Sequence, residues 1–157
     1  KTPSDNRTDY IKRLIGLPGD KIQFVKGKIY LNNNEILRKK IKTKYKIRCG
    51  IFSPEVNAYL ETLPNGKEYV AVYNKQGSMQ NTDEYTVPKG FYFFLGDNRD
   101  CSQDSRYLSS VGYVSSENLV GNAKIIFFSN DTKSGSVLKF WNWSQSLRLE
   151  RFLHLLK

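Results

Sequence analysis

The 157-residue chain is 39% hydrophobic and 13% aromatic, which is sufficient for one domain with a buried core. Its formal net charge of +10 favours an anionic partner such as a lipid surface, although Lys40, Lys42, Lys44 and Lys46 also fit the solvated face of a strand. The sequence has no long apolar run, aromatic-basic RNA motif, zinc-finger spacing or helix-turn-helix pattern. It therefore predicts neither a transmembrane helix in these residues nor a nucleic-acid partner.

The first 37 residues are predicted to form a β-meander. Short apolar runs separated by turn residues are typical of strands joined by tight connections. The turns are supplied by Pro18-Gly19-Asp20, by Lys26-Gly27 and by Asn32-Asn33-Asn34. The strands are predicted at residues 10–15, 21–25, 28–31 and 35–37.

Beyond the meander the pattern is less regular. Further strands are predicted near residues 45–48, 68–73, 91–95 and 123–128, with a Pro64-Asn65-Gly66 turn between the first two. The leucine spacing in residues 144–157 permits a short C-terminal helix. We expect a mostly β, antiparallel barrel or sandwich. Its parts would be a first core segment (1–37), a variable β insertion (38–86) and a second core segment (87–157).

Lys12 lies on the first predicted strand. Alternate side chains of a strand share a face, so Tyr10, Lys12 and Leu14 point the same way. Burial between an aromatic ring and a leucine disfavours the ammonium form and lowers the pKa of a lysine. Such a lysine can act as general base for a hydroxyl nucleophile near neutral pH. The alternative is a snorkelling lysine whose ammonium stays in water, and the strand alone favours that alternative.

A second segment, residues 96–106, crowds carboxylates, guanidiniums and hydroxyls into one loop. These side chains belong to Asp97, Asp100, Asp104, Arg99, Arg106, Ser102 and Ser105. Opposite charges in this proportion predict an ion-pair network that keeps the loop rigid. The serine hydroxyls could orient a neutral lysine. A calcium loop is disfavoured, because it would contain more carboxylates and fewer arginines.

Cysteine and histidine usage also argues against a metal centre. Cys49 and Cys101 form no CxxC motif, and the sequence leaves open whether they form one disulfide. The single histidine, His154, lies in the leucine-rich tail, and this scarcity argues against histidine-based catalysis. We expect neither a metal nor a cofactor.

The lysine strand and the polar loop together resemble two boxes of the bacterial type I signal peptidases. These are Ser-Lys serine proteases that remove signal peptides from exported proteins. Residues 10–20 are similar to the family's lysine box, and residues 96–106 are similar to its GDNRDxSxDSR box. The order of the boxes agrees with the family, as does the Pro88-Lys89-Gly90 turn before the second box. The resemblance covers most of residues 9–129.

The resemblance implies a role for each residue of the site. Lys12 would be the general base, and Ser102 would hydrogen-bond its amine and orient it. Ion pairs that hold the second box in shape would come from Asp97, Asp104, Arg106 and Arg13. Tyr10 and Ile11 would line an apolar substrate site, with Ile11 at the edge of the small pockets that accept Ala-like residues before the cleavage point. The substrate would add as an extended strand.

The main departure of the sequence from the family concerns the nucleophile. The family's nucleophile is a serine in a Ser-Met-x-Pro box, upstream of the lysine and just after a membrane-spanning segment. We expect both to precede Lys1, so that the 157 residues alone would be inactive. Gly77-Ser78-Met79-Gln80 imitates that box, but residue 81 is Asn and the segment follows Lys12. We interpret Ser78 as a loop serine.

The resemblance implies an enzyme of the bacterial inner membrane with its catalytic domain on the outer side. Its partners would be preproteins with small residues before the cleavage site and the membrane lipid surface, which Trp141 and Trp143 could contact. One alternative is a self-cleaving repressor-type Ser-Lys protease, for which Cys49-Gly50 could be the cleaved dipeptide. Another is an inactive β-domain that binds an anionic surface.

Overall fold

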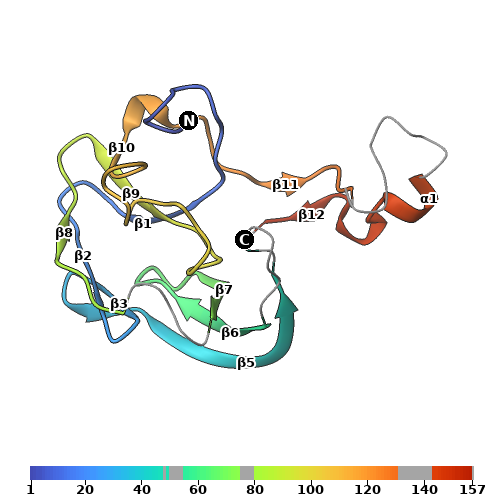
Figure 1. Cartoon of the computed structure of the whole chain (residues 1–157), viewed down its shortest axis with the longest axis horizontal. Helices are drawn as coiled ribbons and strands as arrows, with labels where there is room; N and C mark the ends of the chain where they lie inside the picture. The colour runs from blue at the N-terminus through green and yellow to red at the C-terminus, as the bar shows by residue number, and fades with distance from the viewer. Residues whose placement is uncertain (48, 50–54, 75–79, 131–142, 157) are drawn as a thin grey trace. The chain divides into compact units, whose positions relative to one another are not determined.

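The computed structural model describes residues 1–47, 49, 55–74, 80–130 and 143–156, and Figure 1 shows that their regular structure is almost all β. The paired strands run antiparallel. A mostly β, antiparallel fold is therefore confirmed. The described strands fall into four separate sheets rather than one closed sheet. The strands are β1 (Arg13–Gly16), β2 (Lys21–Val25), β3 (Lys28–Leu31), β4 (Asn34–Glu35), β5 (Leu37–Lys46), β6 (Glu55–Thr62), β7 (Glu68–Asn74), β8 (Tyr85–Thr86), β9 (Phe91–Leu95), β10 (Val114–Ser115), β11 (Ile125–Ile126) and β12 (His154–Leu155).

The meander forms a sheet with strand order β4-β3-β2-β8. The strands predicted at 21–25 and 28–31 are confirmed at these bounds. Lys26 and Gly27 both have positive φ angles, 51° and 71°, as a two-residue hairpin turn requires. Asn32 and Asn33 repeat that geometry between β3 and β4, with φ angles of 50° and 64°. Asparagine tolerates this left-handed backbone better than most residues, which explains the asparagine run.

Residues 37–74 contain a second sheet, with order β5-β6-β7. The sequence predicted strands near 45–48 and 68–73 and missed β6 between them. The Pro64-Asn65-Gly66 turn therefore joins β6 to β7, not the two predicted strands. β6 escapes a periodicity test because its buried positions include Ala58 and Glu61, three residues apart, and one of them is charged.

The core lies under the meander and β9. Its buried residues include Ile22, Phe24, Ile29, Phe93 and Leu95, each at most 2% exposed. β9 also holds the middle of a third sheet, with order β1-β9-β10. β1 begins at Arg13, later than the predicted strand over 10–15, so that Lys12 immediately precedes it. The pairing of Arg13 with Leu95 puts Lys12 beside the loop that follows β9.

The chain divides into two compact units, Lys1–Val120 and Gly121–Lys157. In the second unit β11 pairs with β12, and the strand predicted at 123–128 is reduced to Ile125–Ile126. The tail is helical only at Trp143–Ser146 and in a short 3-10 turn at Leu149–Arg151. Within the residues that the structure describes, no helix is long and apolar enough to cross a membrane.

Candidate active site

Lys12 and Ser102 meet at the end of the β1–β9 pairing. The Nζ atom of Lys12 lies 2.7 Å from Oγ of Ser102, although the residues are 90 positions apart in the chain. Ser102 is only 9% exposed. Gly96 makes this approach sterically feasible, since a Cβ atom there would lie 2.0 Å from Ser102 Oγ and 3.5 Å from Lys12 Nζ. The glycine that opens the second box is thus required by packing.

The surroundings of Lys12 favour its neutral amine. Burial of the side chain lowers the pKa of Lys12, because the ammonium form loses hydration. The charges of Asp104 and Asp97 act in the opposite direction on this pKa, and Arg106 adds to the lowering. The Nζ atom also lies 5.2 Å from the centre of the Tyr10 ring. Lys12 therefore sits in a half-buried, partly aromatic environment next to a hydroxyl.

Two ion pairs fix the loop around this contact. Arg13 donates two hydrogen bonds to Asp97, with Nε at 2.8 Å and Nη2 at 2.9 Å. Arg106 binds Asp104 in the same forked manner, at 2.8 and 2.9 Å, and both side chains are buried. Asp104 also accepts a hydrogen bond from the backbone N–H of Gly96 at 2.9 Å. Bidentate arginine–carboxylate pairs are rigid, and they fix both ends of the loop that carries Ser102.

A third ion pair was not expected from the sequence. Arg99 pairs with Glu61 of β6, and each side chain is 1% exposed. The hydroxyl of Tyr69 donates to Glu61 at 2.7 Å and accepts from Arg99 at 3.0 Å, and Tyr73 donates to the other oxygen of Glu61. Burial raises the pKa of both tyrosines, so they remain neutral donors. The guanidinium of Arg13 stacks 4.0 Å from the centre of the Tyr69 ring, which connects this cluster to the site.

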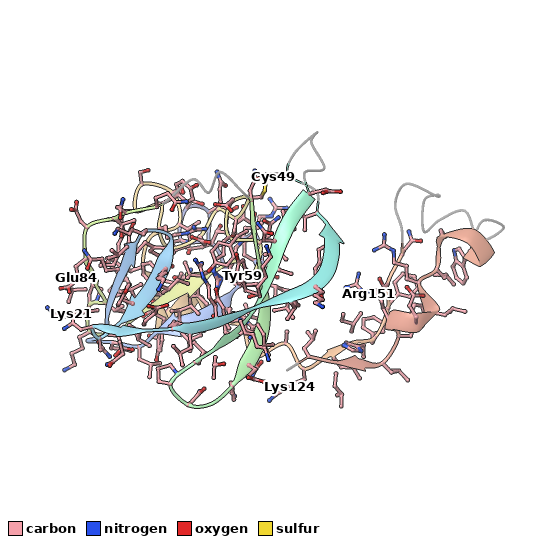
Figure 2. The ribbon with its side chains drawn as sticks, turned by 90° about the horizontal axis from the view of Figure 1, so that it is seen from below. Lys21, Cys49, Tyr59, Glu84, Lys124 and Arg151 are labelled. Atoms are coloured by element: carbon pink, nitrogen blue, oxygen red, sulfur yellow. A yellow bond between two sulfur atoms is a disulfide. The ribbon has the colours of Figure 1, made fainter. Side chains whose placement is uncertain are left out.

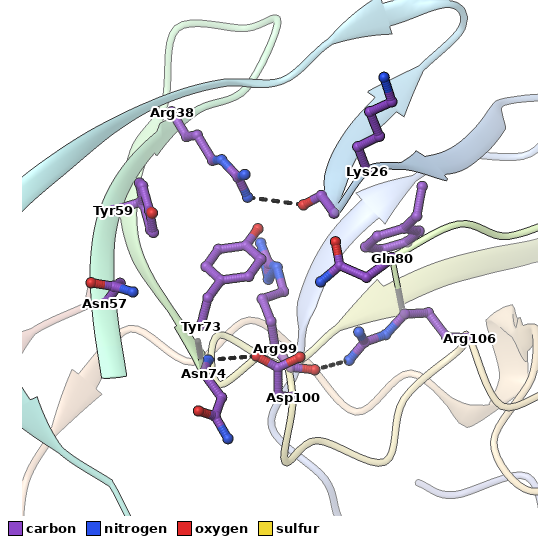
Figure 3. Close-up of a pocket in the computed structure, with 12 residues that line it drawn as sticks. Lys26, Arg38, Asn57, Tyr59, Tyr73, Asn74, Gln80, Arg99, Asp100 and Arg106 are labelled. Atoms are coloured by element: carbon purple, nitrogen blue, oxygen red, sulfur yellow. Dashed lines mark hydrogen bonds between the residues drawn. The ribbon is translucent and has the colours of Figure 1, made fainter. Parts of the chain in front are cut away.

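Two members of this cluster, Arg99 and Tyr73, line a polar pocket of about 160 Å³, drawn in Figure 3. Its wall includes Arg38, Tyr73, Arg99 and Arg106, and the figure shows Arg106 donating to the backbone carbonyl of Arg99. Lys12 is not among its described lining residues. The pocket therefore borders the loop at Arg99, Asp100 and Arg106 and does not include the Lys12–Ser102 contact.

A disulfide joins Cys49 to Cys101, with the two Cα atoms 5.4 Å apart. Figure 2 shows its sulfur atoms beside the Cys49 label. The sequence left this pairing open. The position of Cys101 inside the polar loop was the one feature that could have suggested it. The bond connects the chain beyond β5 directly to the residue before Ser102.

The substrate-side residues predicted from the sequence lie on the surface. Ile11 is 82% exposed and Tyr10 is 46% exposed. Leu14 and Leu17 are also exposed on the same stretch. A half-buried amine and hydroxyl bordered by exposed apolar side chains suit proton transfer on a bound, extended peptide. Ser78, Gly50 and Trp141, each singled out in the sequence, lie outside the described residues, while Trp143 is 41% exposed.

Comparisons with known proteins agree on one family. The family model described as signal peptidase, peptidase S26, matches residues 1–128. The signal peptidase I of Rickettsia conorii is 43% identical over 168 residues, which cover 96% of this chain and 60% of that protein. The signal peptidase I of Rickettsia bellii is 41% identical over 173 residues, or 96% of this chain and 55% of that protein. The chain thus spans 55–60% of the length of these curated relatives. A solved signal peptidase I from Enterococcus faecalis is 25% identical, with a TM-score of 0.41, over 78% of this chain and 89% of that chain.

Proposed function

The chain belongs to the signal peptidase S26 family, and from that premise we propose that it is the base-bearing part of a serine endopeptidase that removes signal peptides from exported preproteins. The observation that carries the proposal is the 2.7 Å contact between Lys12 Nζ and Ser102 Oγ. It is supported by the lowered pKa of Lys12, because only a neutral amine can accept a proton.

The proposed reaction is acyl transfer in two steps. Neutral Lys12 takes the proton of a serine hydroxyl supplied by a part of the protein outside these residues, while the serine oxygen attacks the scissile carbonyl carbon. The tetrahedral intermediate collapses when the carbon–nitrogen bond breaks and the Lys12 ammonium protonates the leaving amine. Lys12 then deprotonates a water molecule, which attacks the acyl carbon. The bond from that carbon to the serine oxygen breaks as the Lys12 ammonium returns its proton to the serine, and the peptide leaves with a new carboxyl terminus.

The remaining predicted site residues have supporting roles in this proposal. Ser102 orients the amine of Lys12, and the pairs Arg13–Asp97 and Arg106–Asp104 keep Ser102 in place. Tyr10 and Ile11 border the bound peptide. Their exposure beside Lys12 suits a substrate that arrives as an extended strand.

We further place the intact protein at the bacterial inner membrane, with the site on the outer side. The formal charge of +10 and the exposed apolar side chains of Ile11, Leu14 and Leu17 suit contact with an anionic lipid surface. In this arrangement a preprotein that is still anchored by its signal peptide would meet the site at the lipid surface.

The specificity part of the proposal is tested with the intact protein in phospholipid vesicles and two matched preproteins. One carries alanine as the last residue before the cleavage point, and the other carries phenylalanine there. We expect kcat/KM to be at least about 10²-fold lower for the phenylalanine substrate, because a pocket fitted to a small side chain excludes an aromatic ring. Equal cleavage of both preproteins would contradict this specificity, and cleavage of neither would contradict the activity itself.

The orienting role of Ser102 predicts a defined kinetic effect. Ser102→Ala removes the hydroxyl next to Nζ of Lys12 with little change in volume. We expect kcat to fall about 10²-fold with KM nearly unchanged, because the base is misplaced while peptide binding persists. Ser109→Ala, at an exposed serine after the box, is the matched control and should keep both constants. A Ser102→Ala variant with normal kcat would remove Ser102 from the proposed machinery.

A further inference from the structure

Ser102 lies on a turn that its own backbone holds only loosely. The N–H of Cys101 donates to the carbonyl of Asn98 at 3.3 Å, which is long for such a bond. The hydroxyl of Ser102 also lies 3.4 Å from the carbonyl of Gln103, again a weak contact. Yet the serine must stay within a few tenths of an ångström of its place beside Lys12 if it is to orient the amine. The turn therefore depends on attachments to other parts of the chain.

These attachments lead to the β5-β6-β7 sheet. On the N-terminal side of the turn, Val72 of β7 exchanges backbone hydrogen bonds with the box, donating to Asp97 at 2.8 Å and accepting from Arg99 at 3.0 Å. The side chain of Arg99 is bound to Glu61 of β6. The covalent attachment is the Cys49–Cys101 disulfide, which reaches the chain just beyond β5. It is the attachment nearest to Ser102, since Cys101 is its neighbour in the chain.

We propose that Cys49 and Cys101 are positioning residues whose disulfide holds Ser102 Oγ beside Lys12 Nζ, so that the activity depends on the redox state of this bond. This inference rests on the proposed peptidase function and adds its regulation. Both cysteines are partly exposed, so a small thiol reagent can reach them. With the bond open, the flanks of the turn are still held, by β7 through Val72 and Asn74 on one side and by the Arg106–Asp104 pair on the other. Between these flanks the turn keeps only the weak contacts of its own backbone, so Ser102 can move away from the amine.

The chemistry of opening is a thiol–disulfide exchange with a small dithiol as reductant. One thiolate of the dithiol attacks a sulfur atom of the Cys49–Cys101 bond and forms a mixed disulfide. Its second thiolate then displaces the remaining cysteine. The protein gains two electrons and two protons as two thiols, and the dithiol is oxidised to a cyclic disulfide. Oxidation by a disulfide of the same class reverses the step.

Release of the turn also changes the surroundings of the base. The charged groups that act on Lys12 are Asp104, Asp97 and Arg106, and all three belong to ion pairs that remain after reduction. The change on reduction is therefore mainly access of water to Nζ. Renewed hydration stabilises the ammonium, so we expect the acidic limb of the pH–activity profile to move to higher pH.

The test uses the intact protein in phospholipid vesicles, with a preprotein substrate, before and after treatment with a small dithiol. Mass measurement of alkylated, quenched samples verifies the state of the bond. We expect reduction to lower kcat/KM about 10-fold or more and to shift the acidic limb upward. Cys49→Ser should reproduce both changes without dithiol and should not respond to it, because Cys101 then has no partner. Unchanged kcat/KM and pH profile in the reduced protein would overturn the inference, as would an equal dithiol response of Cys49→Ser.

A loss of general stability has a different signature. Ile29→Ala opens a cavity in the core on β3, a strand that carries no residue of the box, so it should lower the Tm and leave the pH profile unchanged. If Cys49→Ser does not fold, the dithiol titration of the unsubstituted protein still decides the outcome. If the protein cleaves the preprotein, loses activity on Lys12→Ala and is unaffected by the dithiol, only this inference is overturned. An oxidised protein that does not cleave at all overturns the proposed function.

Discussion

Lys12→Ala should abolish cleavage of a preprotein by the intact protein if the proposed function holds. We expect kcat/KM to fall by at least about 10³-fold, because the variant lacks the group that deprotonates the attacking hydroxyl and the hydrolytic water. The Lys12 side chain is half-buried, and the hydroxyl of Ser102 lies 2.7 Å from its amine, where it can orient the base. The measurement is the rate of mature-protein release from a purified preprotein.

Two further variants make this result specific. Lys12→Met keeps the length and the packing of the side-chain stem, and it should be as inactive as Lys12→Ala. It should fold at least as well as the unsubstituted protein, because burial disfavours the ammonium charge of Lys12 that the substitution removes. Lys40→Ala removes an exposed lysine from β5 and should retain normal cleavage. Processing at the normal rate by either Lys12 variant would refute the assignment of the base.

Glu61→Ala should cause the largest loss of stability in the first compact unit. The carboxylate is 1% exposed and compensates a buried guanidinium, Arg99, while it also accepts from the hydroxyls of Tyr69 and Tyr73. Removal leaves an uncompensated buried charge, which costs about 3–5 kcal/mol of unfolding free energy. Denaturant unfolding followed by near-UV circular dichroism of the tyrosines measures this loss.

A surface carboxylate provides the comparison. Glu35 pairs with Lys28 on the exposed face of the meander, so Glu35→Ala should change the unfolding free energy far less than Glu61→Ala. If the two variants were equally stable, the Arg99–Glu61 pair would not be the stabilising contact that its burial indicates. The same measurement therefore separates buried from exposed ion pairs within one protein.

The fold was predictable where local chemistry decides it. The hairpin at Lys26-Gly27 and the strand Phe91–Leu95 follow from turn residues and apolar runs, and the structure has both at the expected places. The tail was less predictable. Its leucine spacing permits a helix, but the observed helix ends at Ser146, and His154–Leu155 pair with β11 instead. A strand partner distant in sequence leaves no local signal.

For the candidate site, the sequence indicated which residues matter but not all of their partners. The two boxes identified Lys12 and Ser102, and the structure places their polar atoms in contact. The partner of Arg99 was expected among the acidic residues of its own loop, yet it is Glu61, from a strand that was not predicted. A buried glutamate in a strand looks like a surface residue until its partner is known. The Cys49–Cys101 pairing was undecided for a related reason, since spacing alone does not specify connectivity.

The distance along the chain between the base and its orienting serine has a consequence for the order of events during synthesis. Lys12 and Ser102 are 90 residues apart, and their contact requires β1 to pair with β9. Long-range pairing of this kind closes late in folding, because the entropy of a large loop must be overcome first. A nascent chain would therefore carry its lysine in a fully hydrated, protonated form until the second box has emerged and docked. The molecule would be proteolytically silent throughout its own synthesis and would become competent only as its last long-range contacts form.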